Sequence, residues 1–115
     1  MSLRFITPTL HGFLDFAAAA GLIAFPFLLG FHNLSLWLSV AGGVGLIGYS
    51  LLTNYALGPL KLISYRTHIV LDLLAAAAFI AAPAVLGFAG LVAIYYYVMG
   101  GGVIAVVGLS GPVKA

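Results

Sequence analysis

The sequence of 115 residues contains no cysteine, only two acidic residues and only four basic ones. Without cysteine the chain cannot form a disulfide, a thiolate metal site or a thiol nucleophile. With 5% charged and 64% hydrophobic residues, it has too few polar side chains to cover a soluble globule. Four basic residues are also too few for the positively charged face that nucleic acid requires. The composition therefore indicates an integral membrane protein surrounded by the lipid bilayer, with no nucleic-acid partner.

Four apolar runs account for most of the chain: residues 9–29, 34–53, 67–86 and 90–109. Each run is about 20 residues long, which at ~1.5 Å per residue in a helix crosses the ~30 Å hydrocarbon layer of a bilayer. Glycine, asparagine and proline gather in the breaks between the runs, as is typical of turns. The sequence therefore predicts an all-α fold with four transmembrane helices.

The basic residues predict how these helices are oriented. The four basic residues are Arg4, Lys61, Arg66 and Lys114. If the chain crosses the bilayer four times, all four lie on one side, and the loops on the other side contain no lysine or arginine. Because basic loops stay in the cytoplasm, we expect both termini and the middle loop to be cytoplasmic. A basic residue before an apolar run is also typical of a signal peptide. The same pattern returns in mid-chain, where no signal peptide can lie, so we favour a membrane helix.

An internal repeat organises the chain. The stretch HGFLDFAAAAGLIAFPFLLGF, residues 11–31, returns 57 positions later as HIVLDLLAAAAFIAAPAVLGF, residues 68–88. Since the repeated unit contains two predicted helices, the chain divides into two tandem helical hairpins, residues 1–58 and 59–115. Both hairpins enter the bilayer from the same side, so we expect a pseudo-twofold axis along the membrane normal to relate them.

The two repeated segments end in a shared motif, AFPFLLGF in the first and AAPAVLGF in the second. This ending after an alanine-rich helix, within a tandem two-helix unit, resembles the SPW-repeat membrane proteins. Phe25 and Ala82 stand where the motif of that family has serine, and Phe27 and Ala84 stand where it has tryptophan. The resemblance implies a small four-helix protein of the bacterial inner membrane and implies no established biochemical activity.

Each repeat carries one histidine and one aspartate in an otherwise apolar helix: His11 and Asp15 in the first, His68 and Asp72 in the second. Because the members of each pair are four positions apart, they share a helix face. Both aspartates lie about 10 Å from the cytoplasmic helix ends, counting ~1.5 Å per residue. A charge at such a depth costs up to ~3 kcal/mol and usually faces the interior of the bundle. We therefore expect the two pairs to meet in one composite site.

Four polar residues near the end of the second predicted helix lie at a similar depth. We expect them to contact the ligands of the site and to hold them in place; they are Tyr49, Ser50, Thr53 and Asn54.

Two kinds of ligand fit the composite site. Two imidazoles and two carboxylates form a set of nitrogen and oxygen ligands for zinc or another divalent metal, with His11, Asp15, His68 and Asp72 as the ligands. Alternatively, the two histidines alone could be the axial ligands of a haem. The function that we predict is therefore the binding of a metal ion or of a small cofactor such as haem, near the cytoplasmic side.

Two alternatives require no ligand. The His/Asp pairs could be hydrogen-bonded glue in a structural or oligomer-forming protein, or they could handle protons or ions, since both side chains titrate. The chain shows no catalytic triad and no phosphate-binding loop, so nothing in it indicates an enzyme.

Small residues spaced four apart predict close packing of membrane helices, as in Ser39 with Gly43 and Gly101 with Ala105. The glycine-rich helix faces could also join copies of the chain into a homo-oligomer.

Overall fold

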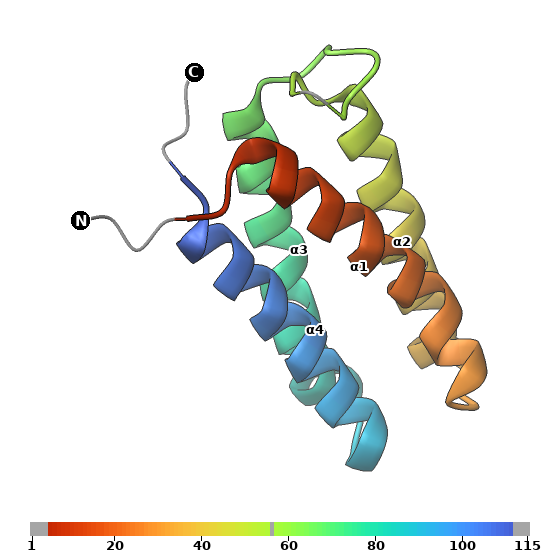
Figure 1. Ribbon diagram of the computed structural model, residues 1–115. Helices are drawn as coiled ribbons and strands as arrows, with labels where there is room; N and C mark the ends of the chain where they lie inside the picture. Colours follow the sequence, from red (N-terminus) through yellow and green to blue (C-terminus); the bar gives the residue numbers. More distant parts are fainter. Residues whose placement is uncertain (1–4, 56, 112–115) are drawn as a thin grey trace.

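The computed structural model describes residues 5–55 and 57–111 and shows a bundle of helices (Figure 1). The helices are α1 Pro8–Leu28, α2 Asn33–Leu52, α3 Tyr65–Leu86 and α4 Gly90–Leu109. Each begins within two residues of its predicted apolar run. With 20 to 22 residues, each is long and apolar enough to cross a membrane. The prediction of an all-helical chain with four such helices is therefore confirmed.

Local capping signals fix where α1 and α3 begin. The Thr7 hydroxyl caps α1 and accepts a hydrogen bond from a backbone N–H of the first turn at 3.2 Å. Ser64 caps α3 in the same way, at 3.1 Å. Such caps satisfy backbone donors that the first helical turn leaves unpaired. His11 and His68 consequently lie at the same place in their helices, four residues after the cap.

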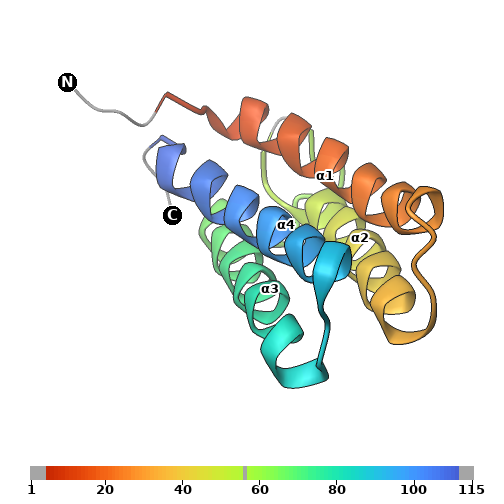
Figure 2. The ribbon, with the colours of Figure 1, turned by 90° about the horizontal axis from the view of Figure 1, so that it is seen from below.

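The chain folds as two hairpins, with α1 packed mainly on α2 and α3 packed mainly on α4 (Figures 1 and 2). A Cβ atom at Gly43 of α2 would lie 2.8 Å from Ala19 O, and one at Gly100 of α4 would lie 2.9 Å from Ala76 O. These glycines therefore let the paired backbones approach closely. The predicted packing role is confirmed for Gly43. In α4 it falls to Gly100, because Gly101 has no neighbouring described atom within 4 Å.

The two hairpins contact each other through polar side chains at both ends of the bundle. At the end where α2 and α4 begin, Tyr95 OH donates to Ser39 Oγ at 2.6 Å, and Ser39 Oγ in turn donates to a backbone oxygen of α1 at 2.7 Å. Tyr96 OH donates to Ser35 O at 2.6 Å. We call these four residues the tyrosine–serine layer. Their neighbour Tyr97 is 48% exposed, so the tyrosine run divides between the interior and the surface.

Short backbone pairings tie the chain together at the opposite end of the bundle. Ile6 pairs with residues 109–111 through bonds of 3.0 and 2.6 Å, and Ile63 pairs with residues 52–54 through bonds of 2.9 and 2.7 Å. The two sets of positions differ by 57 residues. Gly58 allows the connection between α2 and α3 to fold back here, because a Cβ atom at that position would lie 1.9 Å from a backbone oxygen. This connection, described at residues 53–55 and 57–64 and called the 53–64 connection, therefore lies over the end of the bundle.

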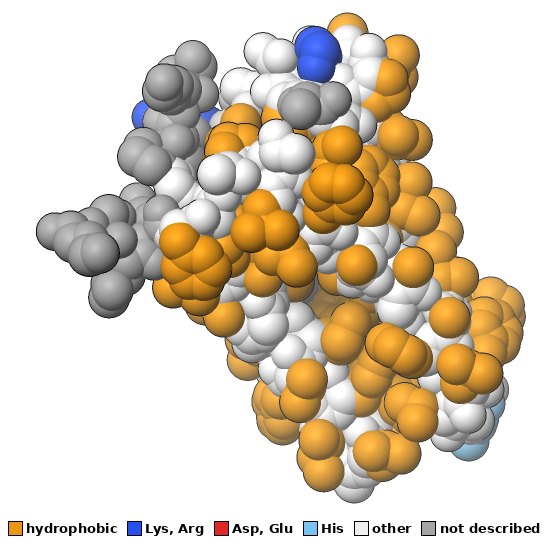
Figure 3. Space-filling model, viewed as in Figure 1, with side chains coloured by type: hydrophobic (Ala, Val, Ile, Leu, Met, Phe, Trp, Pro, Cys, Tyr) orange, Lys and Arg blue, Asp and Glu red, His pale blue; other side chains and the backbone are white. Residues whose placement is uncertain are grey.

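Many large hydrophobic side chains lie on the surface of the described residues, as on the face seen in Figure 3. Large hydrophobic side chains such as Leu28 and Trp37 are 77% and 58% exposed, and both acidic side chains are buried. Of the basic residues that predict the orientation, Arg4 and Lys114 lie outside the described residues. Such a surface is suited to a lipid environment rather than to water.

Candidate functional site

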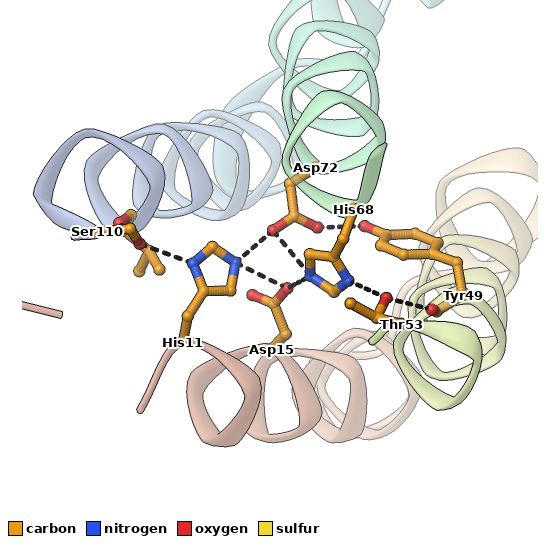
Figure 4. A network of polar contacts seen from close by, with 8 residues as sticks. His11, Asp15, Tyr49, Thr53, His68, Asp72 and Ser110 are labelled. Atoms are coloured by element: carbon orange, nitrogen blue, oxygen red, sulfur yellow. Dashed lines mark hydrogen bonds and ion pairs between the residues drawn. The ribbon is translucent and has the colours of Figure 1, made fainter. Parts of the chain in front are cut away.

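The structure brings the four predicted ligands together (Figure 4). His11 and Asp15 project from the beginning of α1, and His68 and Asp72 from the beginning of α3. All four are at most 3% exposed. We call this group the His/Asp cluster. Two titratable pairs, 57 residues apart in the chain, thus form one buried site between the hairpins.

Nitrogen and oxygen atoms alternate around the centre of the cluster. His11 Nε2 lies 2.7 Å from Asp72 Oδ2 and 3.1 Å from Asp15 Oδ2. His68 Nε2 lies 2.5 Å from Asp15 Oδ2 and 3.4 Å from Asp72 Oδ2. Each histidine therefore makes its shorter contact with the aspartate of the other hairpin.

Each imidazole is also held from its far side by a hydroxyl group of the other hairpin. His11 Nδ1 lies 2.7 Å from Ser110 Oγ, at the end of α4, and His68 Nδ1 lies 2.8 Å from Thr53 Oγ1, at the end of α2. Both hydroxyls donate their proton to a backbone oxygen four residues earlier, at 2.6 and 2.7 Å. Since each hydroxyl has one proton to donate, it must accept from the histidine. Nδ1 therefore carries a proton in both imidazoles.

This assignment determines what the Nε2 atoms do. With Nδ1 protonated, Nε2 of each histidine either carries a second proton, which it donates to the carboxylates, or presents a lone pair. A lone pair facing carboxylate oxygens is repelled unless a proton or a cation lies between them. The hydroxyl partners thus direct both Nε2 atoms towards the carboxylate oxygens, in a group that either protons or a metal ion could neutralise.

The two aspartates have different surroundings. Tyr49 OH donates to Asp72 Oδ1, while Asp15 Oδ1 has no hydrogen-bond partner among the described residues. The residue 57 positions after Tyr49 is Val106, which has no hydroxyl. Asp72 is therefore the more firmly held of the two carboxylates.

The residues predicted to support the site take different positions. Tyr49 and Thr53 contact the cluster as expected. Ser50 is fully buried but makes no hydrogen bond with its side chain to a described residue. Asn54 is exposed, and its backbone N–H donates to Ile63 O at 2.7 Å. The sequence reasoning missed Ser110, although it lies 57 residues after Thr53 and so was indicated by the repeat.

Two further tyrosines that the sequence reasoning did not single out lie against the imidazoles. The ring centroids of Tyr55 and His68 are 5.5 Å apart, and those of Tyr65 and His11 are 5.6 Å apart. Both tyrosines are buried. They cover the His/Asp cluster from the side of the 53–64 connection. On another side, a cavity of about 30 Å³ reaches Tyr49 and Asp72 between apolar side chains.

Comparison of the chain with protein-family models, with curated proteins and with solved structures found no match. The resemblance to the SPW-repeat proteins therefore stays a prediction, and the function has to be argued from the site itself.

Proposed function

We propose that this chain is an integral membrane protein that binds one divalent first-row transition metal ion, such as zinc, in the His/Asp cluster. The observation that carries the proposal is the convergence of four ligand atoms, two imidazole nitrogens and two carboxylate oxygens, all within 4.8 Å of one another. Histidine nitrogens and carboxylate oxygens are zinc ligands in proteins, and a hydrogen bond to the far ring nitrogen is typical of metal-binding histidines.

The distances in the cluster are close to those of a metal site. Metal–ligand bonds of 2.0–2.2 Å in a tetrahedron place neighbouring ligand atoms about 3.3–3.6 Å apart. The four nitrogen–oxygen distances in the cluster are 2.5, 2.7, 3.1 and 3.4 Å. Shifts of less than about 1 Å would open the group to this geometry. Two carboxylates also balance the charge of a divalent cation, which matters where little water is present to solvate it.

The same geometry favours a metal ion over haem. In a haem with two axial histidines, the flat macrocycle lies between the imidazoles. Here Oδ2 atoms of Asp15 and Asp72 contact both Nε2 atoms, and the His11 and His68 ring centroids are 5.3 Å apart in a T-shaped arrangement. A macrocycle would have to displace both carboxylates and separate the hairpins.

The apolar helices and the repeat support the proposal that the site lies in a membrane. The four apolar helices support a bilayer environment, for which we propose the bacterial inner membrane with cytoplasmic termini. The contacts of His11 with Ser110 and of His68 with Thr53 fall on positions 57 residues apart. This supports two hairpin repeats related by a pseudo-twofold axis that passes through the cluster.

We also propose that copies of the chain associate through glycines on the outer helix faces. A Cβ atom would meet no neighbouring described atom within 4 Å at four glycines, which are Gly45, Gly48, Gly101 and Gly102. Such faces let membrane helices of separate copies approach closely.

The test is metal binding by the detergent-purified chain. Elemental analysis of the protein as purified, followed by calorimetric titration of the metal-free form with Zn²⁺ and Co²⁺, should show one ion per chain. The absorption spectrum of bound Co²⁺ would report tetrahedral nitrogen and oxygen ligands. A Soret band in the purified protein would instead show haem.

The variant that tests the ligands is Asp15→Asn combined with Asp72→Asn, which keeps the shape of both side chains but removes both charges. His32→Gln is the matched control, since His32 is the exposed third histidine at the other end of the bundle. We expect binding to be lost in the double variant and kept in the control. Stable protein that binds neither ion in any form would contradict the proposal and leave the cluster as hydrogen-bonded glue or as a proton-handling group.

A further inference from the structure

Three buried hydroxyl groups beside the His/Asp cluster have no hydrogen-bond partner among the described residues. They are Ser50 Oγ, Tyr55 OH and Tyr65 OH, and their residues are 0%, 6% and 5% exposed. Leaving a buried hydroxyl unpaired costs about 1–3 kcal/mol, so nearly all such groups bind another polar group or an ordered water molecule. Three of them close to one site indicate that this part of the interior is hydrated.

Ser50 and Tyr55 are five residues apart, near the end of α2 and just beyond it, and neither hydroxyl has a hydrogen-bond partner among the described residues. Buried polar groups without a direct partner are commonly joined through water.

The unpaired hydroxyls are not repeated along the chain. The positions related to Ser50, Tyr55 and Tyr65 by the 57-residue shift hold Val107, Pro112 and Pro8, none of which has a side-chain hydroxyl. The two repeats agree in the four ligands and in the hydroxyl that holds each histidine, but they differ here. The difference adds hydroxyl groups on the side of the cluster that faces the 53–64 connection, which makes that side more polar.

The tyrosine rings close this polar side. The Tyr55 and Tyr65 ring centroids are 6.1 Å apart, and each ring lies against an imidazole. Tyr55 in turn rests on Gly12, where a Cβ atom would lie 2.8 Å from the tyrosine ring. Tyr55 belongs to the connection rather than to a helix, so a rotation of its ring away from the site would not require a helix to move.

We propose that the 53–64 connection forms a hydrated entrance to the His/Asp cluster, with Tyr55 and Tyr65 as its lid and with ordered water bound to their hydroxyls and to Ser50. A metal ion enters and leaves the site by this route. The role for the ion rests on the function proposed above, while the hydration of the entrance does not.

The hydration can be tested in the unmodified protein by hydroxyl-radical footprinting. Tyr55 and Tyr65 are compared with Tyr95, which is equally buried at 7% exposed but whose hydroxyl is paired with Ser39. Since oxidation follows contact with water rather than burial alone, we expect Tyr55 and Tyr65 to be oxidised at least about tenfold faster than Tyr95. Equal rates for the three tyrosines would overturn the hydrated entrance.

The absence of native cysteine allows a second test, using one cysteine at a time. Ser50→Cys is compared with Ser39→Cys, since both serines are on α2 and fully buried, but the hydroxyl of Ser39 is paired within the tyrosine–serine layer. The probe is a small, charged, water-soluble methanethiosulfonate. Because only a hydrated thiol reacts readily, we expect modification at Ser50 to be at least about tenfold faster. Equal protection at both positions would count against the proposal.

The lid is tested by the rate of Co²⁺ binding to Tyr55→Ala. Removing the ring opens the entrance and keeps all four ligands, so we expect faster binding and faster release, each by about tenfold or more, at nearly constant affinity. Unchanged rates would overturn the lid. If Co²⁺ binds to no form of the protein, the metal function fails, while the footprinting and the cysteine labelling still decide whether the entrance is hydrated.

Discussion

The two hairpins are joined by two polar layers of different chemistry. In the tyrosine–serine layer, neutral hydroxyl groups bond to one another and to backbone oxygens, as with Ser39 and Tyr95. In the His/Asp cluster, four titratable side chains direct their ligand atoms at one another. Ser39, Tyr95 and Tyr96 are buried, as is the whole His/Asp cluster, and both layers link the same two hairpins. The layers therefore differ mainly in charge and in whether their polar atoms point at one common centre.

The difference bears on the role of the cluster. Neutral hydroxyls are sufficient to join the hairpins at one end of the bundle, and they require no burial of charge. If the other end needed only adhesion, the same residue types would serve there at a smaller desolvation cost. Two histidines and two aspartates in that place therefore favour a function beyond adhesion.

The largest effect should follow from removing the nitrogen ligands, by His11→Gln together with His68→Gln. Loss of outer hydrogen-bond partners alone commonly weakens metal binding by ~10–100-fold, so loss of two ligands should exceed about 100-fold. Calorimetric titration with Zn²⁺ measures this. Tyr96→Phe in the other layer serves as the control and should bind zinc normally; equal loss in both would show that the change acts through the fold.

The next effect should come from Thr53→Val, which removes the hydroxyl that holds His68 and keeps the shape of the side chain. The imidazole would lose its fixed orientation and tautomer, and Zn²⁺ affinity should fall by ~10–100-fold. Ser35→Ala is a suitable control, because the Ser35 hydroxyl bonds to a backbone oxygen at the far end of the bundle. An unchanged affinity in Thr53→Val would show that this hydrogen bond does not position the ligand.

A smaller effect is expected for Tyr49→Phe, since Tyr49 touches the oxygen of Asp72 that does not face the histidines. One hydrogen bond contributes about 1 kcal/mol, which corresponds to a change in affinity of roughly fivefold. The reverse change, Val106→Tyr, introduces a hydroxyl at the related position and tests whether a hydrogen bond to Asp15 raises the affinity. A loss above about 100-fold in Tyr49→Phe would place Tyr49 among the ligands themselves.

The smallest effect on metal binding should come from Ser39→Ala, in which the free energy of unfolding changes instead. The Tyr95 hydroxyl loses its buried acceptor, and hydrogen bonds of this kind between membrane helices contribute on average ~0.6 kcal/mol and up to ~1.7 kcal/mol. Unfolding in mixed detergent gives this value, and titration with Zn²⁺ should give an unchanged affinity. A change in affinity would mean that the two layers are coupled.

Much of this arrangement could be predicted from the sequence. The lengths of the apolar runs predicted the four helices, and the spacing of His11 and Asp15, repeated in the second hairpin, predicted the meeting of the ligands. Depth in the bilayer also predicted contacts from Tyr49 and Thr53. These features depend on helix geometry, which is set by local sequence.

Other features depend on tertiary contacts that sequence spacing does not determine. Gly100 packs in α4 in place of Gly101, because one residue turns the contact face of a helix by about 100° and spacing alone does not fix that rotation. Tyr55 lies over the site because Gly58 lets the connection fold back on Thr53.

The crosswise support of the imidazoles implies that half of the chain cannot form the site. His11 takes its hydroxyl partner from α4 and its closest carboxylate from α3, so an isolated hairpin would have only an aspartate one turn away. Two copies of one hairpin carrying histidine, aspartate and the terminal hydroxyl could assemble the whole set, but only as fast and as fully as their concentration allowed. Joining the two in a single chain replaces that dependence with a high effective concentration. Fusion also allows each repeat to change independently of the other. Position 49 can therefore hold tyrosine while the related position 106 holds valine.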